Sequence, residues 1–130
     1  MATDKTVLKD KKITIYKKVT TRDSAGFQTT GYMPITETGI FWAYFKQLSA
    51  DLMYKQNSTF NGESCYFRVN WNQYLRTATP SDLSIGYRGI VYDVTRVDPY
   101  EDYKRDLVLY GKTSTRSSIS PIIPYDPTKL

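Results

Sequence analysis

The sequence predicts an all-β protein: a small β-barrel or sandwich of about six to seven short antiparallel strands, with a long loop between the central strands and an extended C-terminal arm. Short runs in which apolar and polar residues alternate recur along the chain, and clusters of Gly, Pro, Asp and Ser separate them. The 12 tyrosines also favour strands and interfaces. A chain of 130 residues is long enough for one domain. We expect one barrel domain over residues 1–112, with a flexible N-terminal segment over 1–11, and an arm over 113–130.

The first third of the chain predicts two strands and an irregular connection. Residues 12–19 (KITIYKKV) place Ile13, Ile15 and Val19 on one face, as in a half-buried strand. Residues 20–38 contain several turn-forming residues, so we expect a loop or an irregular hairpin whose pairing is short or at an edge. Residues 40–46 (IFWAYFK) are apolar on both faces, which predicts the most buried strand, covered within the domain or by a neighbouring subunit.

The middle of the chain predicts a long excursion followed by a clear strand. In residues 47–63 the alternation stops, and Leu48, Leu52 and Met53 are spaced as in one helical turn. Residues 64–71 then show the cleanest alternation in the chain and predict a half-exposed antiparallel strand. The residues on its apolar face are Cys65, Phe67, Val69 and Trp71.

The last third predicts a hairpin and an arm. After a turn at residues 79–82, Leu83 and Ile85 predict a short strand that ends in a corner at Gly86. Residues 90–97 and 103–110 predict two strands joined through a loop at 99–102. Residues 113–130 are rich in Ser, Thr and Pro and can continue neither a helix nor a central strand. This arm either docks on a neighbouring subunit or is disordered.

The composition argues against catalysis and metal binding. The chain has no His and a single Cys, so the commonest general base and any CxxC site are absent from the sequence. The carboxylates are scattered in turns, and Cys65 lies on the apolar face of its strand, where it is expected to be a small core residue. We expect no enzyme activity and no cofactor. No signal peptide or membrane-spanning run is visible, which predicts no membrane contact.

The net charge of +5 suits either a soluble basic domain or contact with nucleic acid or an acidic ring of partner subunits. Aromatic and basic residues alternate in Tyr66-Phe67-Arg68 and in Tyr87-Arg88. Such a pattern fits a platform on which single-stranded nucleic acid stacks, but ordinary cross-strand packing explains it better.

The order of these segments resembles the phage head-tail adaptor family, also called head-completion, head-closure or stopper proteins. The resemblance rests on the ITI strand at residues 13–15, the D-x-x-G loop at Asp23–Gly26 and the dipeptide Trp42-Ala43. It continues through the strand at residues 66–71, the block at 85–98 and the final strand at 107–110, and so covers about residues 12–112. The chain departs from the family pattern at Trp71, in the longer loop before it and in the Pro-rich arm.

The resemblance implies a structural virion protein of a siphovirus-like phage, assembled in the cytoplasm of the host bacterium. Such a protein forms a ring of about twelve copies. The ring docks on the portal-adaptor ring above it, closes the DNA channel after packaging, touches the packaged DNA transiently and without sequence preference, and binds a tail-terminator or other tail protein below.

Two groups of residues are the candidates for these roles. The resemblance places the channel loop between the second and third main strands, and the candidate residues there are Gln47, Asp51, Lys55, Gln56, Asn57, Ser58 and Thr59. The candidate interface residues are Trp42, Phe45, Tyr66 and Arg68 on the strands, and Ile119, Ile122, Ile123 and Tyr125 in the arm. Two alternatives stay open: a head-tail joining protein that assembles on the tail side, and a β-barrel that binds single-stranded nucleic acid.

Overall fold

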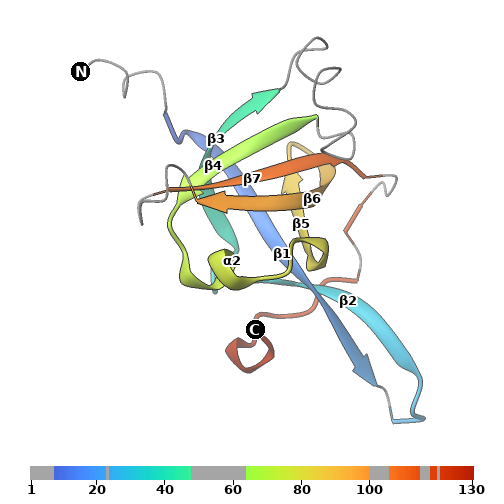
Figure 1. Ribbon diagram of the computed structural model, residues 1–130. Helices are drawn as coiled ribbons and strands as arrows, with labels where there is room; N and C mark the ends of the chain where they lie inside the picture. The colour runs from blue at the N-terminus through green and yellow to red at the C-terminus, as the bar shows by residue number, and fades with distance from the viewer. Residues whose placement is uncertain (1–7, 23, 48–63, 100–105, 115–117, 120) are drawn as a thin grey trace.

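The computed structural model describes residues 8–22, 24–47, 64–99, 106–114, 118–119 and 121–130. Most of these residues belong to one antiparallel sheet of seven strands (Figure 1). The strands are β1 (Lys11–Arg22), β2 (Gln28–Pro34), β3 (Ile40–Gln47), β4 (Cys65–Asn70), β5 (Leu83–Tyr87), β6 (Ile90–Pro99) and β7 (Asp106–Thr113). The described part also contains a short helix, α2 (Gln73–Thr77), and 3₁₀ turns at Pro80–Asp82 and Pro127–Lys129.

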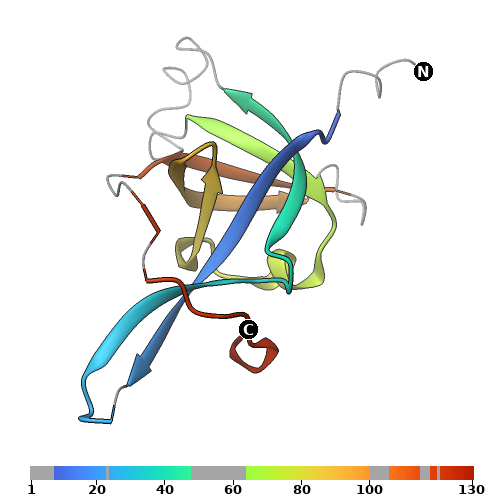
Figure 2. The same ribbon diagram turned by 180° about the vertical axis from the view of Figure 1, so that it is seen from behind.

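The sheet closes on itself into a barrel. Its strand order is β2-β1-β3-β4-β7-β6-β5, and β5 also pairs with β1. Six strands therefore form a closed antiparallel barrel, and β2 is one extra strand outside it (Figures 1 and 2). This confirms the predicted all-β class and selects the barrel over the sandwich.

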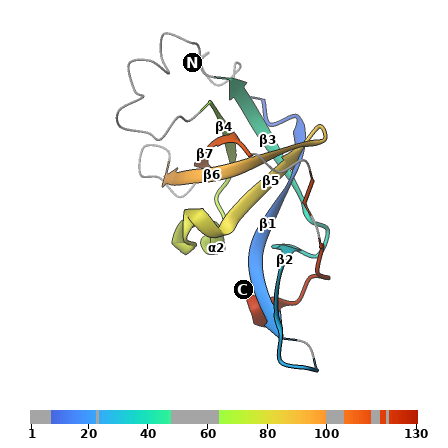
Figure 3. The same cartoon turned by 90° about the vertical axis from the view of Figure 1, so that its right-hand side faces the viewer.

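Strand β1 takes part in both the barrel and a projecting hairpin. Thr14 pairs with β3 on one edge of β1 and with β5 on the other. Tyr16 pairs with Pro34 of β2 and with β5, so β3 and β2 follow one another along the same edge. Within the described residues, the partners of β1 beyond Lys17 all belong to β2. The β1–β2 hairpin consequently extends past the end of the barrel (Figures 1 and 3).

This hairpin corrects the prediction of a loop or irregular hairpin over residues 20–38. Its register is continuous from Tyr16↔Pro34 to Arg22↔Gln28. The β-branched threonines near its tip favour extended backbone, and Gly26, at φ +88°, supplies the left-handed conformation needed in the turn. The prediction that this pairing lies at an edge is confirmed, because β2 ends the sheet.

The prediction that β3 is the most buried strand is wrong, and its outer face is not covered within the domain; cover by a neighbouring subunit stays a prediction. Phe41, Ala43 and Phe45 face inward, but the side chain of Trp42 on the outer face is 53% exposed. A barrel wall has a single interior face, and the described part of the chain leaves the outer face of β3 open at Trp42. Strands β5 and β7 are more deeply buried.

The barrel interior is filled by the residues that the alternation predicted. Cys65, Phe67 and Val69 of β4 are fully buried, as expected, while Tyr66 and Arg68 point outward. Other fully buried side chains come from β1, β2, β5, β7 and α2: Ile13, Ile15, Met33, Leu75, Leu83, Ile85, Leu107 and Leu109.

Helix α2 was not predicted from the sequence, which indicated only a turn in this region. The side chain of Asn72 caps the helix by accepting a hydrogen bond from the backbone nitrogen of Leu75, at 3.1 Å. Leu75 is completely buried in the core. A helix of five residues is too short to produce a helical period in the sequence, which is why the alternation of apolar and polar residues did not reveal it.

The described part of the C-terminal arm lies against β2 of the same chain. The backbone nitrogen of Tyr32 donates to the carbonyl of Pro121 at 2.9 Å, and the nitrogen of Ile123 donates to the carbonyl of Tyr32 at 2.9 Å. Farther along, Lys17 donates to the carbonyl of Lys129 at 2.8 Å. Neither sequence expectation, docking on a neighbour or disorder, included this packing within the chain.

Gly31 makes room for Ile123 of the arm, and Gly86 lies beside Ile119 at a distance that a Cβ atom would also tolerate. A Cβ atom at Gly31 would lie 2.5 Å from Cδ1 of Ile123, and one at Gly86 would lie 3.7 Å from Cδ1 of Ile119. Glycine in a strand often marks the close approach of another segment. Gly31 in β2 and Gly86 in β5 therefore form the seat of the arm.

We expect Gly31→Val to release the arm and to lower the free energy of unfolding by about 1–3 kcal/mol, because the new side chain overlaps Ile123. The measurement is urea unfolding, with limited proteolysis to follow the arm. The matched control is a chain that ends at Ser114, where valine has nothing to displace. An equal loss of stability in both chains would show that Gly31 does not act through the arm.

Candidate functional site

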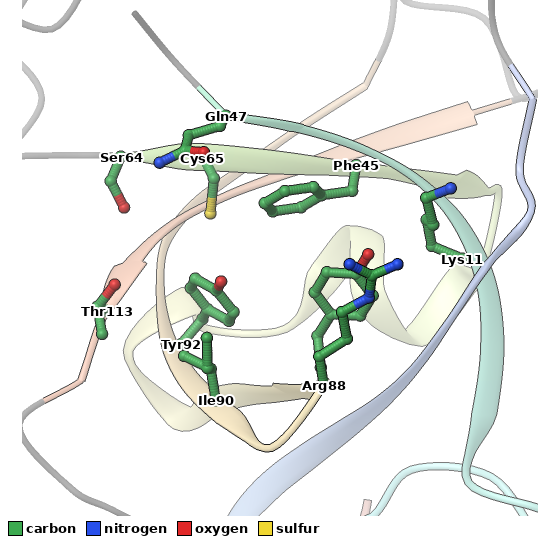
Figure 4. A pocket seen from close by; sticks show the side chains of 10 residues that line it. Lys11, Phe45, Gln47, Ser64, Cys65, Arg88, Ile90, Tyr92 and Thr113 are labelled. Atoms are coloured by element: carbon green, nitrogen blue, oxygen red, sulfur yellow. The ribbon is translucent and has the colours of Figure 1, made fainter. Parts of the chain in front are cut away.

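One end of the barrel is open and forms a cavity of about 420 Å³ (Figure 4). It lies where β3 ends, β4 begins and β5 turns into β6. We call this cavity the barrel mouth, and its lining residues are Lys11, Phe45, Gln47, Ser64, Cys65, Tyr87, Arg88, Ile90, Tyr92 and Thr113. In Figure 4 the cations Lys11 and Arg88 lie on one side of the mouth, and Ser64 and Thr113 on the other.

The inner wall of the mouth is aromatic. The ring of Phe45 lies 5.1 Å from that of Phe67 and 5.0 Å from that of Tyr87, measured between ring centres. Phe67 in turn packs edge-on against Tyr87 and Tyr92. Such tilted and edge-to-face pairs hold one another in place, so the wall is preformed.

Arg88 occupies a strained position at the rim of the mouth. The two-residue turn between β5 and β6 consists of Arg88 at φ +53° and Gly89 at φ +77°. These values suit a type I′ turn, in which the first position favours Asn, Asp or Gly. A left-handed arginine costs on the order of 1 kcal/mol or more. Its guanidinium carbon lies 5.3 Å from the ring centre of Tyr87.

Cys65 is a core residue, as predicted. Its side chain is 1% exposed, and the thiol lies 3.8 Å from the carbonyl oxygen of Gly111, to which it donates. Burial raises the pKa of the Cys65 thiol to about 11, although a hydrogen bond with Ser64 opposes the shift. A thiol with so high a pKa is a poor nucleophile near neutral pH.

The outer face of the barrel carries a stripe of tyrosines. The rings of Tyr44, Tyr66 and Tyr110 follow one another at centre distances of 6.2 and 5.6 Å. The guanidinium of Arg96 lies 3.6 Å from the centre of the Tyr110 ring. These residues come from β3, β4, β7 and β6, so cross-strand packing accounts for the interleaving of aromatic and basic residues in the sequence.

An ion network beside this stripe ties the N-terminal residues to the barrel. Lys9 Nζ and Arg68 Nε each lie 2.7 Å from one carboxylate oxygen of Asp106, which is almost buried. Burial raises the pKa of Asp106, but the hydrogen bonds from Lys9 and Arg68 outweigh this effect and hold the pKa below its ordinary value.

The structure separates the candidate interface residues of the strands. Trp42 is exposed on the outer face of β3, with the ammonium of Lys12 5.8 Å from its ring centre. Phe45 lies on the inner face of the same strand, because residues three apart in a strand point to opposite faces. Tyr66 belongs to the outer stripe, and Arg68 to the ion network.

The arm residues and the candidate channel loop have different positions. Ile119 packs near Gly86 and Ile123 against Gly31, whereas Ile122 is 57% exposed and Tyr125 is partly exposed. Gln47 is the exposed last residue of β3 and lines the mouth. The other six loop candidates lie outside the described residues: Asp51, Lys55, Gln56, Asn57, Ser58 and Thr59.

Neither a metal site nor a membrane span is found in the part of the chain that the structure describes. Within the described ranges, no three His, Cys, Asp or Glu side chains gather in a way that could hold a metal ion. None of the helices described there has the length and hydrophobicity required to cross a membrane.

Comparison with known proteins identifies the family. The model of a protein family described as phage head completion protein matches residues 8–112. The chain belongs to the phage head completion family. This family is a class of structural proteins of the phage particle, not of enzymes, and its members interact with other head or tail proteins. A search of curated proteins gives no significant match.

The family match includes the barrel and its mouth but not the arm. The mouth-lining residues all lie between residues 8 and 112, apart from Thr113. In this head completion protein the described arm residues 118–119 and 121–130 lie outside the matched region, and Ile119 and Ile123 pack beside two of its glycines. Sequence reasoning did not select the exposed Phe27, and it noted Arg88 only for its alternation with Tyr87 and not for its place in a hairpin turn.

The ion network predicts a pH-dependent contribution to stability. Asp106→Asn leaves Arg68 and Lys9 without their carboxylate, so we expect a loss of about 1–3 kcal/mol in unfolding free energy at pH 7. Because the pKa of Asp106 is lower in the folded chain, its contribution is present above pH about 4 and fades as pH falls through the folded pKa.

Urea unfolding of both proteins at pH 7 and pH 3 measures the difference, with the exposed Asp10→Asn as the control. A gap between wild type and Asp106→Asn that stays equally wide at pH 3 would exclude the network as its source.

Proposed function

We propose that the chain forms a ring at the junction of head and tail, docks on the portal-adaptor ring, closes the DNA channel after packaging and provides the attachment site for the tail. The family match over residues 8–112 carries this proposal. Membership of a head completion family implies a role after the head has been built, when the packaged DNA must be retained and the tail must be joined.

The outer face of β3 supports a contact between subunits. Ile40 and Trp42 are exposed there, at 41% and 53%, and Trp42 pairs in register with Lys12 of β1. Leu8, which precedes β1 by three residues, is 60% exposed. Exposed apolar side chains that lie near one another mark interaction surfaces, and Trp is enriched at the centres of interfaces. We assign this face to a neighbour in the head–tail assembly.

The segment between β3 and β4, which contains the predicted channel loop, is our candidate for the part of the chain that faces the DNA. Gln47 and Cys65, which flank this segment in the sequence, are paired where β3 ends and β4 begins. The net charge of +5 suits transient contact with phosphates without base recognition. Closure of the channel by this segment remains a prediction from the sequence resemblance.

The proposal is tested first in a lysate of the parent phage that lacks this chain. We expect complete free tails beside heads of full size that are empty or losing DNA, because nothing then closes the exit through which the DNA entered. Electron microscopy and quantification of the DNA in purified heads measure this outcome. Full heads beside unjoined tails would place the chain on the tail side instead, and normal virions would refute the proposal.

The candidate channel loop gives a separate prediction. Replacement of residues 55–58 by a Gly-Ser link of the same length should leave packaging intact and cause heads to lose DNA afterwards, because the polar residues assigned to closure are missing. DNA content is followed over time in purified heads, with Gly-Ser replacement of the exposed residues 37–38, between β2 and β3, as the control. Full retention of DNA by the loop variant would contradict a closing role for these residues.

A further inference from the structure

Two features at opposite ends of the molecule fit one another in size and chemistry. One is Phe27, at the tip of the β1–β2 hairpin, and the other is the barrel mouth. We infer that Phe27 of one copy inserts into the barrel mouth of the next copy and links the copies head to tail. This inference rests on the proposed ring and specifies one contact within it.

Phe27 projects from the tip of the β1–β2 hairpin as an exposed aromatic side chain, which we call the knob. Its side chain is 71% exposed, and it follows Gly26, where an added Cβ atom would meet no heavy atom of the described residues within 4 Å. The hairpin that carries it is stabilised by continuous pairing of β1 with β2. The arm also braces the base of the hairpin through the backbone of Tyr32. The aromatic ring at the end of this supported hairpin therefore lies outside the core, with most of its surface open to a partner.

The mouth has the size and the chemistry to receive an aromatic ring. Its volume of about 420 Å³ exceeds the roughly 150 Å³ of an apolar cavity that holds benzene. Phe45, Tyr87 and Tyr92 provide aromatic walls. Arg88 at the rim provides a guanidinium group, which is attracted to the face of an aromatic ring.

The geometry of β1 excludes insertion within one chain. Lys11, at the start of β1, lines the mouth, and Arg22, at the end of β1, precedes the hairpin turn. At about 3.3 Å per residue, the two ends of this strand are separated by roughly 35 Å. A knob and a socket at opposite ends give a heterologous contact, which generates a ring when the rotation between copies closes.

The strain at Arg88 supports a function for its side chain. Asparagine in place of arginine would relieve the left-handed backbone of a type I′ turn. A strained residue at the rim of a cavity is a candidate for binding, because the backbone of the turn itself favours a different residue. We therefore expect Arg88 to lower the stability of the folded chain, through its left-handed backbone, and to favour the contact between copies, through its side chain.

The test uses phage particles in which a plasmid-borne chain replaces the phage copy. Phe27 is exchanged for the photo-crosslinking aromatic p-benzoylphenylalanine, which keeps a ring at the tip, and particles are irradiated. We expect a crosslinked dimer of this chain, with peptide mapping that joins position 27 to residues 87–92. The same amino acid at Lys18, an exposed residue of β1 farther from the tip, is the control and should give no such product.

The outcomes separate this inference from the proposed function. DNA-filled particles that contain the chain and give no 27-to-mouth product, or that join position 27 to another protein, would overturn the inference and leave the ring proposal in place. Absence of the wild-type chain from purified heads would overturn both.

Arg88→Asn provides a second readout. The variant should melt at the same or a higher temperature than wild type, because the turn is relaxed, and should lower the yield of the crosslinked dimer severalfold. An undiminished yield with a raised melting temperature would show that Arg88 takes no part in the contact.

Discussion

The double pairing of β1 is the constraint on which the rest of the structure depends. Its first half closes the barrel between β3 and β5, and its second half leaves the barrel to form the hairpin with β2. Because one continuous strand does both, the hairpin is rigidly connected to the barrel wall. The direction of β1 also fixes the position of the mouth, since Lys11 at its start lies on the rim. A change that weakens β1 would therefore disturb the core, the hairpin and the arm together.

The two ends of the barrel differ in how they are filled. Leu75 from α2 lies fully buried in the core, and Asn72 caps the helix that carries it. The mouth is lined instead by aromatic rings that remain partly accessible around Phe45. In a small barrel the inward-facing side chains of the strands fill the interior. Space for another molecule is therefore found most easily at an end of the barrel. The asymmetry of the ends gives the molecule a direction, which a ring built from identical copies requires.

Local alternation made the barrel predictable, whereas contacts distant in sequence did not. In β4 the buried positions of Cys65, Phe67 and Val69 follow directly from a period of two. In β3 the same reasoning failed, because an apolar residue such as Trp42 looks identical in sequence whether it faces its own core or a partner. The seat of the arm needs Gly31 and Ile123 to meet across more than half of the chain, and no periodicity encodes that meeting. The candidate site could likewise not be predicted from the sequence, because residues of six strands that are distant in sequence come together to form the mouth.

Basic side chains lie over several aromatic rings of the barrel. Lys12 lies over Trp42, which is 53% exposed, Arg96 lies over the partly exposed Tyr110, and Arg88 lies over Tyr87, which is buried. Each such contact is worth about 0.5–1 kcal/mol at an exposed site, which is too little to resist a specific partner. This free energy is nevertheless enough to keep a positive charge beside each ring. Like charges on two copies of the chain repel one another and oppose unspecific contact between the rings. The net charge of +5 adds to this repulsion. We infer that Lys12 and Arg96 disfavour unspecific contact between copies of the chain at Trp42 and Tyr110.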